Sequence, residues 1–118
     1  MIALKLKCAN TVELEMKGKV TAADYKLMRP KLEKIFKEKG RMKFLINLDS
    51  LKSFSLGATY EDIKFDIQNL KDVGTTAIVG NKKAQETVTN LIDLIFPAKV
   101  KFFDSKRQAE ALTWLQNY

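Results

Sequence analysis

Hydroxyl side chains gather in one stretch of this sequence. Ser53, Ser55 and Thr59 stand close together, with Leu56 and Gly57 between them, after an apolar run and before an amphipathic segment. Hydroxyl groups in such a loop can accept a phosphate or bind a partner, and they are also ordinary solvated loop and capping residues. This stretch is a candidate binding edge for a partner or ligand, with loop solvation as the simpler alternative.

A second polar stretch opens a predicted helix. It contains Gly80, Asn81 and Lys82, followed by another lysine. Free backbone N–H groups and the positive end of a helix attract anions, and the lysines add charge. The Gly-x-x-x-x-Gly-Lys-Ser/Thr spacing of a nucleotide-binding loop is absent. The stretch is therefore a second candidate binding edge, and the alternative is a turn in which Asn81 caps the helix.

Residues for catalysis or metal binding are few. The chain has no histidine and one cysteine, Cys8, so it lacks the commonest general base and cannot form an intramolecular disulfide. Asp62 and Asp66 share a helix face, but no third metal ligand accompanies them. No nucleophile–base motif is visible. We predict that the protein is not an enzyme and that it holds no metal and no cofactor.

Composition predicts one domain over residues 1–118. Apolar residues make up 46% and charged residues 30%, which is ordinary for a globular protein. No apolar run approaches the ~20 residues of a membrane span, and residues 1–20 alternate rather than forming a signal peptide. We therefore expect a cytoplasmic protein without a membrane span.

The net charge of +7 arises from the first 43 residues. A basic patch attracts nucleic acid, anionic lipid or an acidic partner, and a lysine-rich helix can also be simply solvated. Because the basic helix carries no recognised nucleic-acid motif, we do not expect nucleic-acid binding.

Hydrophobic periodicity predicts alternating strands and helices. We expect a hairpin from residues 2–7 and 11–17. A helix should follow to about residue 39, with Thr21 as its N-cap, Asp24 three residues on in a capping-box arrangement, and Pro30 inside it. We expect later strands at 44–48, 75–79 and 99–103, and a loop at 49–57. We expect later helices at 58–70 and 82–95, and a final helix that a Ser105/Gln108 capping-box pair begins.

This order, ββαβαβαβα, predicts an α/β fold. Strands that are separated by helices pair in parallel, so we expect a five-stranded, mostly parallel mixed sheet with four helices. Ligands of such sheets bind beyond the carboxyl ends of the strands, where both polar stretches are expected.

Four aromatic residues are candidates for lining an apolar pocket: Tyr60, Phe65, Trp114 and Tyr118. The alternative is that they belong to the core. An exposed sheet face or the end of the chain at Trp114 and Tyr118 could also support a homodimer.

Several local signatures occur in a characteristic order. They are Gly18-Lys19-Val20-Thr21, Asp24-Tyr25, Pro30 and residues 44–49, 62–65, 77–82, 102–104 and 111–115. Together they resemble the SpoIIAA-like family of STAS domains over residues 11–116. The architecture is also similar to that of the lipid-binding CRAL-TRIO domains.

The STAS resemblance implies a non-catalytic regulatory or protein-interaction module. In STAS regulators of sigma factors, a partner kinase phosphorylates a serine in an Asp-Ser-Ser-Gly-type stretch. Here residues 53–58 read Ser-Phe-Ser-Leu-Gly-Ala, so the expected position falls near Leu56 or Gly57. Ser55 is the candidate phosphoacceptor. The CRAL-TRIO likeness implies, alternatively, a small apolar ligand or lipid, which requires a cavity of about 300 Å3 or more.

Overall fold

A central five-stranded sheet organises the computed structural model, which describes residues 1–95 and 97–117. Its strand order is β1-β2-β4-β6-β7. The strands are β1 (Ile2–Cys8), β2 (Thr11–Met16), β4 (Met42–Asn47), β6 (Val73–Gly80) and β7 (Val100–Asp104). β1 pairs antiparallel with β2, and all other neighbours pair in parallel. The predicted mixed sheet is confirmed.

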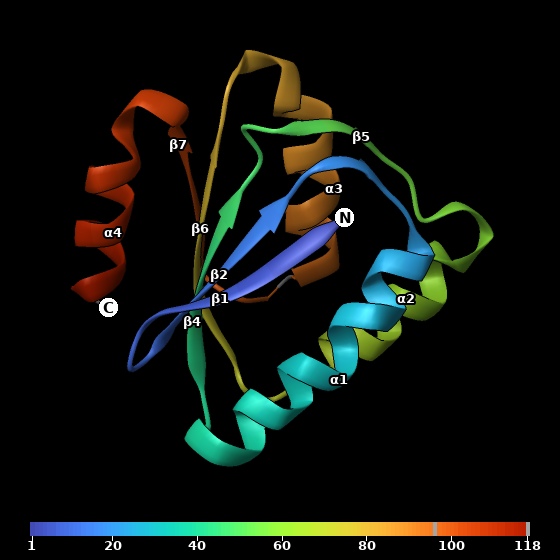
Figure 1. Cartoon of the computed structure of the whole chain (residues 1–118), viewed down its shortest axis with the longest axis horizontal. Coiled ribbons are helices and arrows are strands. Elements are labelled where there is room, and N and C mark those ends of the chain that lie inside the picture. Colours follow the sequence, from blue (N-terminus) through green and yellow to red (C-terminus); the bar gives the residue numbers. More distant parts are fainter. Residues whose placement is uncertain (96, 118) are drawn as a thin grey trace.

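Four helices cover the two faces of this sheet. They are α1 (Ala22–Lys39), α2 (Tyr60–Gln68), α3 (Gln85–Ile95) and α4 (Gln108–Gln116). Figure 1 places α4 on one side of the sheet and the other three helices on the opposite side. Short 3-10 turns at Gly57–Thr59, Lys82–Ala84 and Ser105–Arg107 lead into α2, α3 and α4.

Capping residues fix the start of α1 and of the 3-10 turn that leads into α4. The Thr21 N–H donates to the Asp24 carboxylate at 2.8 Å, which confirms the predicted cap and lowers the pKa of Asp24. The helix continues through Pro30. The prediction that Ser105 and Gln108 form a capping box at the start of the last helix is wrong. Instead, the Asp104 carboxylate accepts from the Lys106 N–H at 3.0 Å, because an ionised carboxylate is a stronger acceptor than a serine hydroxyl.

The predicted loop at 49–57 contains a strand, which is a correction. Within it, β5 (Leu51–Phe54) pairs in parallel with β3 (Gly18–Val20) to form a separate two-stranded sheet. Gly18 has φ +61°, a left-handed conformation that glycine adopts without strain and that turns the chain from β2 into β3. The Ser55 N–H then donates to the Val20 carbonyl at 3.0 Å.

The sheet separates two apolar cores. Phe44 and Ile46 of β4 face the larger core beneath α1, α2 and α3, while Leu45 faces the smaller core beneath α4. This alternation follows from the period of two along a strand. The smaller core consists of Leu45, Ala77, Val79, Phe103, Ala111 and Leu115.

Candidate binding site

The hydroxyl-rich stretch lies on and after β5. Ser53 and Ser55 are exposed, whereas the Thr59 hydroxyl donates to the Leu56 carbonyl at 2.6 Å and serves the local turn. Gly57 has φ +58°, so the turn requires a residue without a side chain. The Leu56 side chain is buried and belongs to the larger core, so it faces the interior rather than an outer edge.

The second polar stretch forms a capped turn. Asn81 accepts from the Lys83 N–H at 2.9 Å through its side-chain oxygen, and Lys82 is exposed. Gly80 ends β6 against Leu48, where a Cβ would lie 3.2 Å from the Leu48 Cβ. Asn81 therefore caps the turn, which is the alternative to a binding role that the sequence left open for it.

The structure does not bring the two predicted stretches together. In Figure 1, β5 carries the chain from the end of β4 toward the start of α2, while the turn after β6 stays above α3. The segment that follows β5 therefore lies apart from the turn that follows β6. The two stretches are therefore two separate candidate edges.

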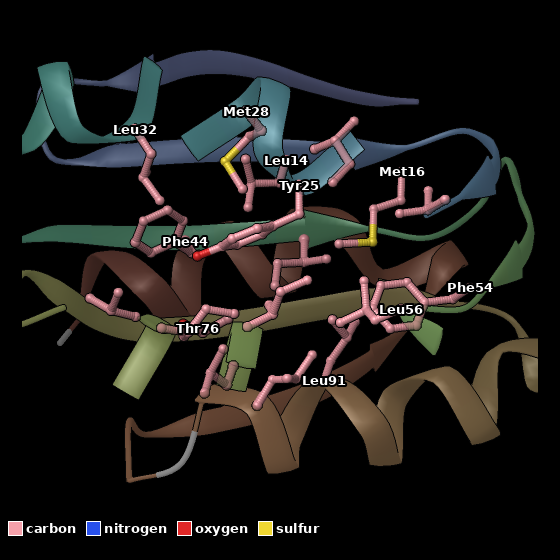
Figure 2. A pocket seen from close by; sticks show the side chains of 18 of the residues that line it. Leu14, Met16, Tyr25, Met28, Leu32, Phe44, Phe54, Leu56, Thr76 and Leu91 are labelled. Carbon is pink, nitrogen blue, oxygen red and sulfur yellow. The ribbon is translucent and has the colours of Figure 1, made fainter. Parts of the chain in front are cut away.

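An apolar cavity lies between the sheet and the three helices of the larger core. Its volume is about 80 Å3. Figure 2 shows Met16, Phe54 and Leu56 toward one end and Leu32, Phe44 and Thr76 toward the other. The described lining residues are Ile2, Leu14, Met16, Val20, Tyr25, Met28, Leu32, Phe44, Ile46, Phe54, Leu56, Ile63, Ile67, Leu70, Val73, Thr76, Leu91, Leu94 and Ile95.

No charged side chain lines this cavity among the described residues. The Thr76 hydroxyl donates to the Gly74 carbonyl at 3.1 Å, so its polar atom is already satisfied. An apolar cavity of this kind favours a hydrocarbon group over water, which needs several polar partners.

A polar cluster joins α1 to α2 beside the cavity. Arg29 donates through Nε to the Asp66 carboxylate at 2.8 Å, and the Tyr25 hydroxyl donates to the same group. The Arg29 hydrogen bond is the main cause that lowers the pKa of Asp66. Burial, and then the Asp66 carboxylate, raise the pKa of Tyr25 above its ordinary value. The cluster holds the cavity-lining Tyr25 in place.

We expect Asp66→Asn to lower the free energy of unfolding by about 1–2 kcal/mol at pH 7, since it removes a partly exposed ion pair and weakens a part-buried hydrogen bond. Because folding lowers the pKa of Asp66 below 3.8, this contribution is present above the unfolded pKa. It is lost as pH falls through the folded pKa. Urea unfolding from pH 7 to pH 2 measures the difference.

The matched control for this prediction is Asp62→Asn, on the same helix and exposed. It should cost less than half as much at pH 7. Equal losses for the two variants would contradict a stabilising role for the cluster.

A second cluster joins α2 to α3. Asp93 accepts from the Tyr60 hydroxyl at 2.8 Å and from Lys64 at 3.1 Å. Burial, followed by the hydrogen bond to Asp93, raises the pKa of Tyr60 to about 12. The Tyr60 hydrogen bond in turn is the main cause that lowers the pKa of Asp93. This cluster fixes α2 against α3, as the first cluster fixes α1 against α2.

An outer cavity adjoins the apolar one. Its volume is about 220 Å3, and it is lined by Arg41, Ile67, Gln68, Leu70, Lys71, Val73, Ile95, Pro97 and Ala98. Ile67, Leu70, Val73 and Ile95 line both cavities. Sequence reasoning missed this site, because its lining comes from three separate segments: Arg41, residues 67–73, and residues 95, 97 and 98.

The aromatic residues that line the cavity are not the predicted ones. Tyr25, Phe44 and Phe54 line it, whereas Phe65 points outward and is 72% exposed. Trp114 packs on Phe103 of the smaller core, with ring centroids 5.7 Å apart. Two of the four aromatic residues expected to line a pocket remain. Tyr60 contacts Asp93 through its hydroxyl, and Tyr118 lies outside the described residues.

Neither a metal site nor a membrane span appears in residues 1–95 and 97–117. No three acidic or cysteine side chains group closely enough there to hold a metal ion. No helix in this part of the chain is both long and apolar enough to cross a membrane. The predicted homodimer stays a prediction.

The fold and the comparisons together define the class of protein. This fold, a sheet of order β1-β2-β4-β6-β7 with helices on both faces, is similar overall to that of the anti-sigma-factor antagonist SpoIIAA in its unphosphorylated form. That structure is 10% identical, with a TM-score of 0.63, and the match covers 96% of this chain and 98% of SpoIIAA. The Bacillus cell fate determinant SpoIIAA in its phosphorylated form is 11% identical, with a TM-score of 0.61 over 95% of this chain and 99% of the other. The chain thus has the fold of SpoIIAA.

Sequence comparison identifies the family. The SpoIIAA-like family model matches residues 11–116, and the chain belongs to the SpoIIAA-like family. A crystal structure of an uncharacterised protein with a SpoIIAA-like fold from Shewanella loihica is 30% identical, with a TM-score of 0.70 over 98% of this chain and 92% of the other. No curated protein matches this chain in sequence.

Proposed function

We propose that this protein is a non-catalytic regulatory module that binds a protein partner through the outer face of α2 and residues 53–59. Membership of the SpoIIAA-like family supports the regulatory class. The observation that carries the binding surface is Phe65, an aromatic side chain 72% exposed on the solvent face of α2. Exposed aromatic residues are enriched among the residues that dominate protein–protein binding energy.

The position of Phe65 fits this proposal. It follows the exposed Ser53 and Ser55 along the chain, and its neighbour Asp66 fixes α2 to α1. The helix face is therefore rigid, and a partner would lose little conformational entropy in ordering it. Ser55 is the candidate phosphoacceptor at this edge, and a phosphate there would add charge beside the bound partner.

We expect Phe65→Ala to weaken partner binding at least about tenfold without lowering stability, because it removes an exposed anchor. A photo-cross-linking amino acid at position 65 or 55, introduced in cells of the source organism, should capture the same protein. The affinity of that purified protein for each variant then measures the effect.

The matched control is Leu27→Ala on α1, since Leu27 is 73% exposed and lies outside the proposed surface. It should bind the captured protein as the unaltered chain does. The proposal fails if positions 65 and 55 capture nothing that position 27 does not, or if both alanine variants bind equally well.

The alternative function, the binding of a small apolar ligand, would use the apolar cavity between the sheet and α1, α2 and α3. At about 80 Å3 it is smaller than the ~300 Å3 typical of ligand pockets. The outer cavity of about 220 Å3 is a separate one with polar as well as apolar lining residues. Ligand binding and partner binding involve opposite faces of α2, so the two functions are compatible.

A further inference from the structure

We propose that the open edge of β1 is a docking site for an extended segment of a partner protein, in which apolar and acidic residues alternate. The segment lies beside β1 as an added strand of the sheet. This edge is separate from the surface on α2 and residues 53–59, so the inference stands or fails independently of the proposed function.

The backbone of β1 has hydrogen-bonding groups without a strand partner. Among the described strands, β1 is an edge strand and pairs only with β2. The Met1 carbonyl accepts from the Lys17 N–H at 2.8 Å, and the Met1 amine donates to the Lys17 carbonyl at 3.0 Å. In an antiparallel pair this exchange recurs at every second residue, so the odd-numbered residues of β1 face β2. The N–H and C=O groups of three even-numbered residues point outward: Ile2, Leu4 and Leu6.

The side chains of these outward-facing residues make one face of the edge apolar. Ile2 and Leu4 pack against the larger core, whereas Leu6 is 44% exposed. An added strand forms about two main-chain hydrogen bonds with each such residue, and its side chain at that position lies on the same face. Apolar residues at alternate positions of the partner segment therefore cover Leu4 and Leu6.

The other face of the edge is cationic. Lys5 and Lys7 both stand there and are exposed. Lys7 pairs with Glu13 at 3.8 Å, and Glu13 also lies opposite Lys5 on β2, so one carboxylate faces two lysines. Within the described part of the chain, Lys5 forms no ion pair. Acidic residues of an added strand would stand directly beside these lysines, and opposite charges on neighbouring strands attract.

α1 adds two further cations beside the edge. α1 contacts β1, and Arg29 on the other side of this helix turns toward α2. Lys31 follows Arg29 by two residues, about 200° around the helix, so it lies on the flank away from α2. Lys34 shares that flank. Both lysines are exposed, and neither forms an ion pair in residues 1–95 and 97–117. Glu38, one turn beyond Lys34, offsets only one of these charges.

A second copy of this chain fits the edge poorly. It would bring the same lysines to an edge that already holds them: Lys5, Lys7, Lys31 and Lys34. Lysines on an edge strand are a known device against pairing between identical strands. An acidic strand reverses the sign of this interaction, so the same lysines that oppose self-pairing favour the proposed partner.

The test is an NMR titration of the full isotope-labelled chain with three capped peptides. They are Glu-Val-Glu-Val-Glu-Val-Glu, Lys-Val-Lys-Val-Lys-Val-Lys and Glu-Val-Glu-Pro-Glu-Val-Glu. The acidic valine peptide should shift the amide signals of Ile2, Leu4 and Leu6 and slow their hydrogen exchange, because these N–H groups become hydrogen-bonded. We expect it to bind at least about tenfold more tightly than the lysine peptide. The proline peptide lacks a central N–H and should also bind at least about tenfold more weakly.

Variants of the chain separate the two sources of affinity. Leu4→Pro removes an outward N–H that β2 does not use, and an edge strand tolerates proline at such a position. It should keep the fold and lose at least about tenfold in affinity for the acidic peptide. Should Leu4→Pro unfold, the proline peptide tests the same hydrogen bonds on the unaltered chain. Lys5→Gln/Lys31→Gln should lose about fivefold. Lys83→Gln/Lys106→Gln removes the same charge elsewhere and should change the affinity less than about twofold.

The remaining outcomes would each overturn the site. Equal affinity for the acidic and lysine peptides would remove the charge selection, and equal affinity for the valine and proline peptides would remove the strand pairing. If none of the peptides binds, the site fails. Sedimentation of the chain alone checks the other occupant, since a dimer that Leu4→Pro abolishes would assign the edge to a second copy. None of these results depends on partner capture at Phe65, because the peptides bind at a different surface.

Discussion

Leu115→Ala should lower the free energy of unfolding by about 3 kcal/mol. Leu115 is 0% exposed in the smaller core, where α4 is the only helix among the described residues that covers the sheet. Removing a buried leucine side chain loses its transfer free energy and leaves a cavity, at a typical cost of about 2–5 kcal/mol. Urea unfolding at constant pH measures the loss.

Leu112→Ala is the control for this prediction, because Leu112 lies on the same helix and is only half-buried. It should cost about 1 kcal/mol. A loss below about 1 kcal/mol for Leu115→Ala would mean that α4 is not held by its apolar face. Since the sheet separates the two cores, Leu115→Ala should also leave the Met16 and Met28 methyl signals unchanged.

Gly74→Ala should lower the free energy of unfolding by about 2–3 kcal/mol. A Cβ at position 74 would lie 2.7 Å from the Met42 carbonyl oxygen, a contact that needs backbone movement to relieve. The two atoms belong to β6 and β4, which hydrogen-bond in the middle of the sheet. Overpacking of this kind costs about 1–3 kcal/mol. Thermal and urea unfolding of the purified variant measure the effect.

Gly80→Ala offers a graded comparison on the same strand. Its Cβ would lie 3.2 Å from the Cβ atoms of Ala84 and Leu48, a tight contact that a small movement relieves. The expected loss is about 1 kcal/mol. Neither glycine has a positive φ, so the gain from a less flexible unfolded chain is similar for both. A larger loss at position 80 than at position 74 would contradict the steric explanation.

Much of the fold follows from local patterns in the sequence. The alternation of Val12, Leu14 and Met16 placed one face of β2 in the core, and these side chains are buried there. The Thr21 and Asp24 pair marked the start of α1 because capping depends only on neighbouring residues. Parallel pairing followed from the alternation of strands and helices.

The small second sheet could not be predicted in this way. β5 contains Lys52 and Ser53, which reduce its strand signal, and its partner β3 is three residues long. What stabilises the pair is the distant contact between these segments, which no local pattern encodes. The consequence for the site is large, because β5 carries the chain away from the turn that follows β6.

The candidate site was predicted only in part. Helical spacing places Asp66 on the same face as Asp62, but the partners of Asp66 are Tyr25 and Arg29 on another helix. The spacing of Tyr25 and Arg29, one helical turn apart, was an available signal that they share a face. The two cavities depend on how helices pack across the sheet, so their lining residues are spread over the chain.

The sheet order also has a consequence for how quickly the chain folds. The β1–β2 hairpin closes locally, but β4 can pair with β2 or β6 only after an intervening helical crossover has been brought into place. The entropy of closing these long loops is lost before the pairing contributes any stability. Folding should therefore be slower than in a helical bundle of this length, with the hairpin as the earliest native contact.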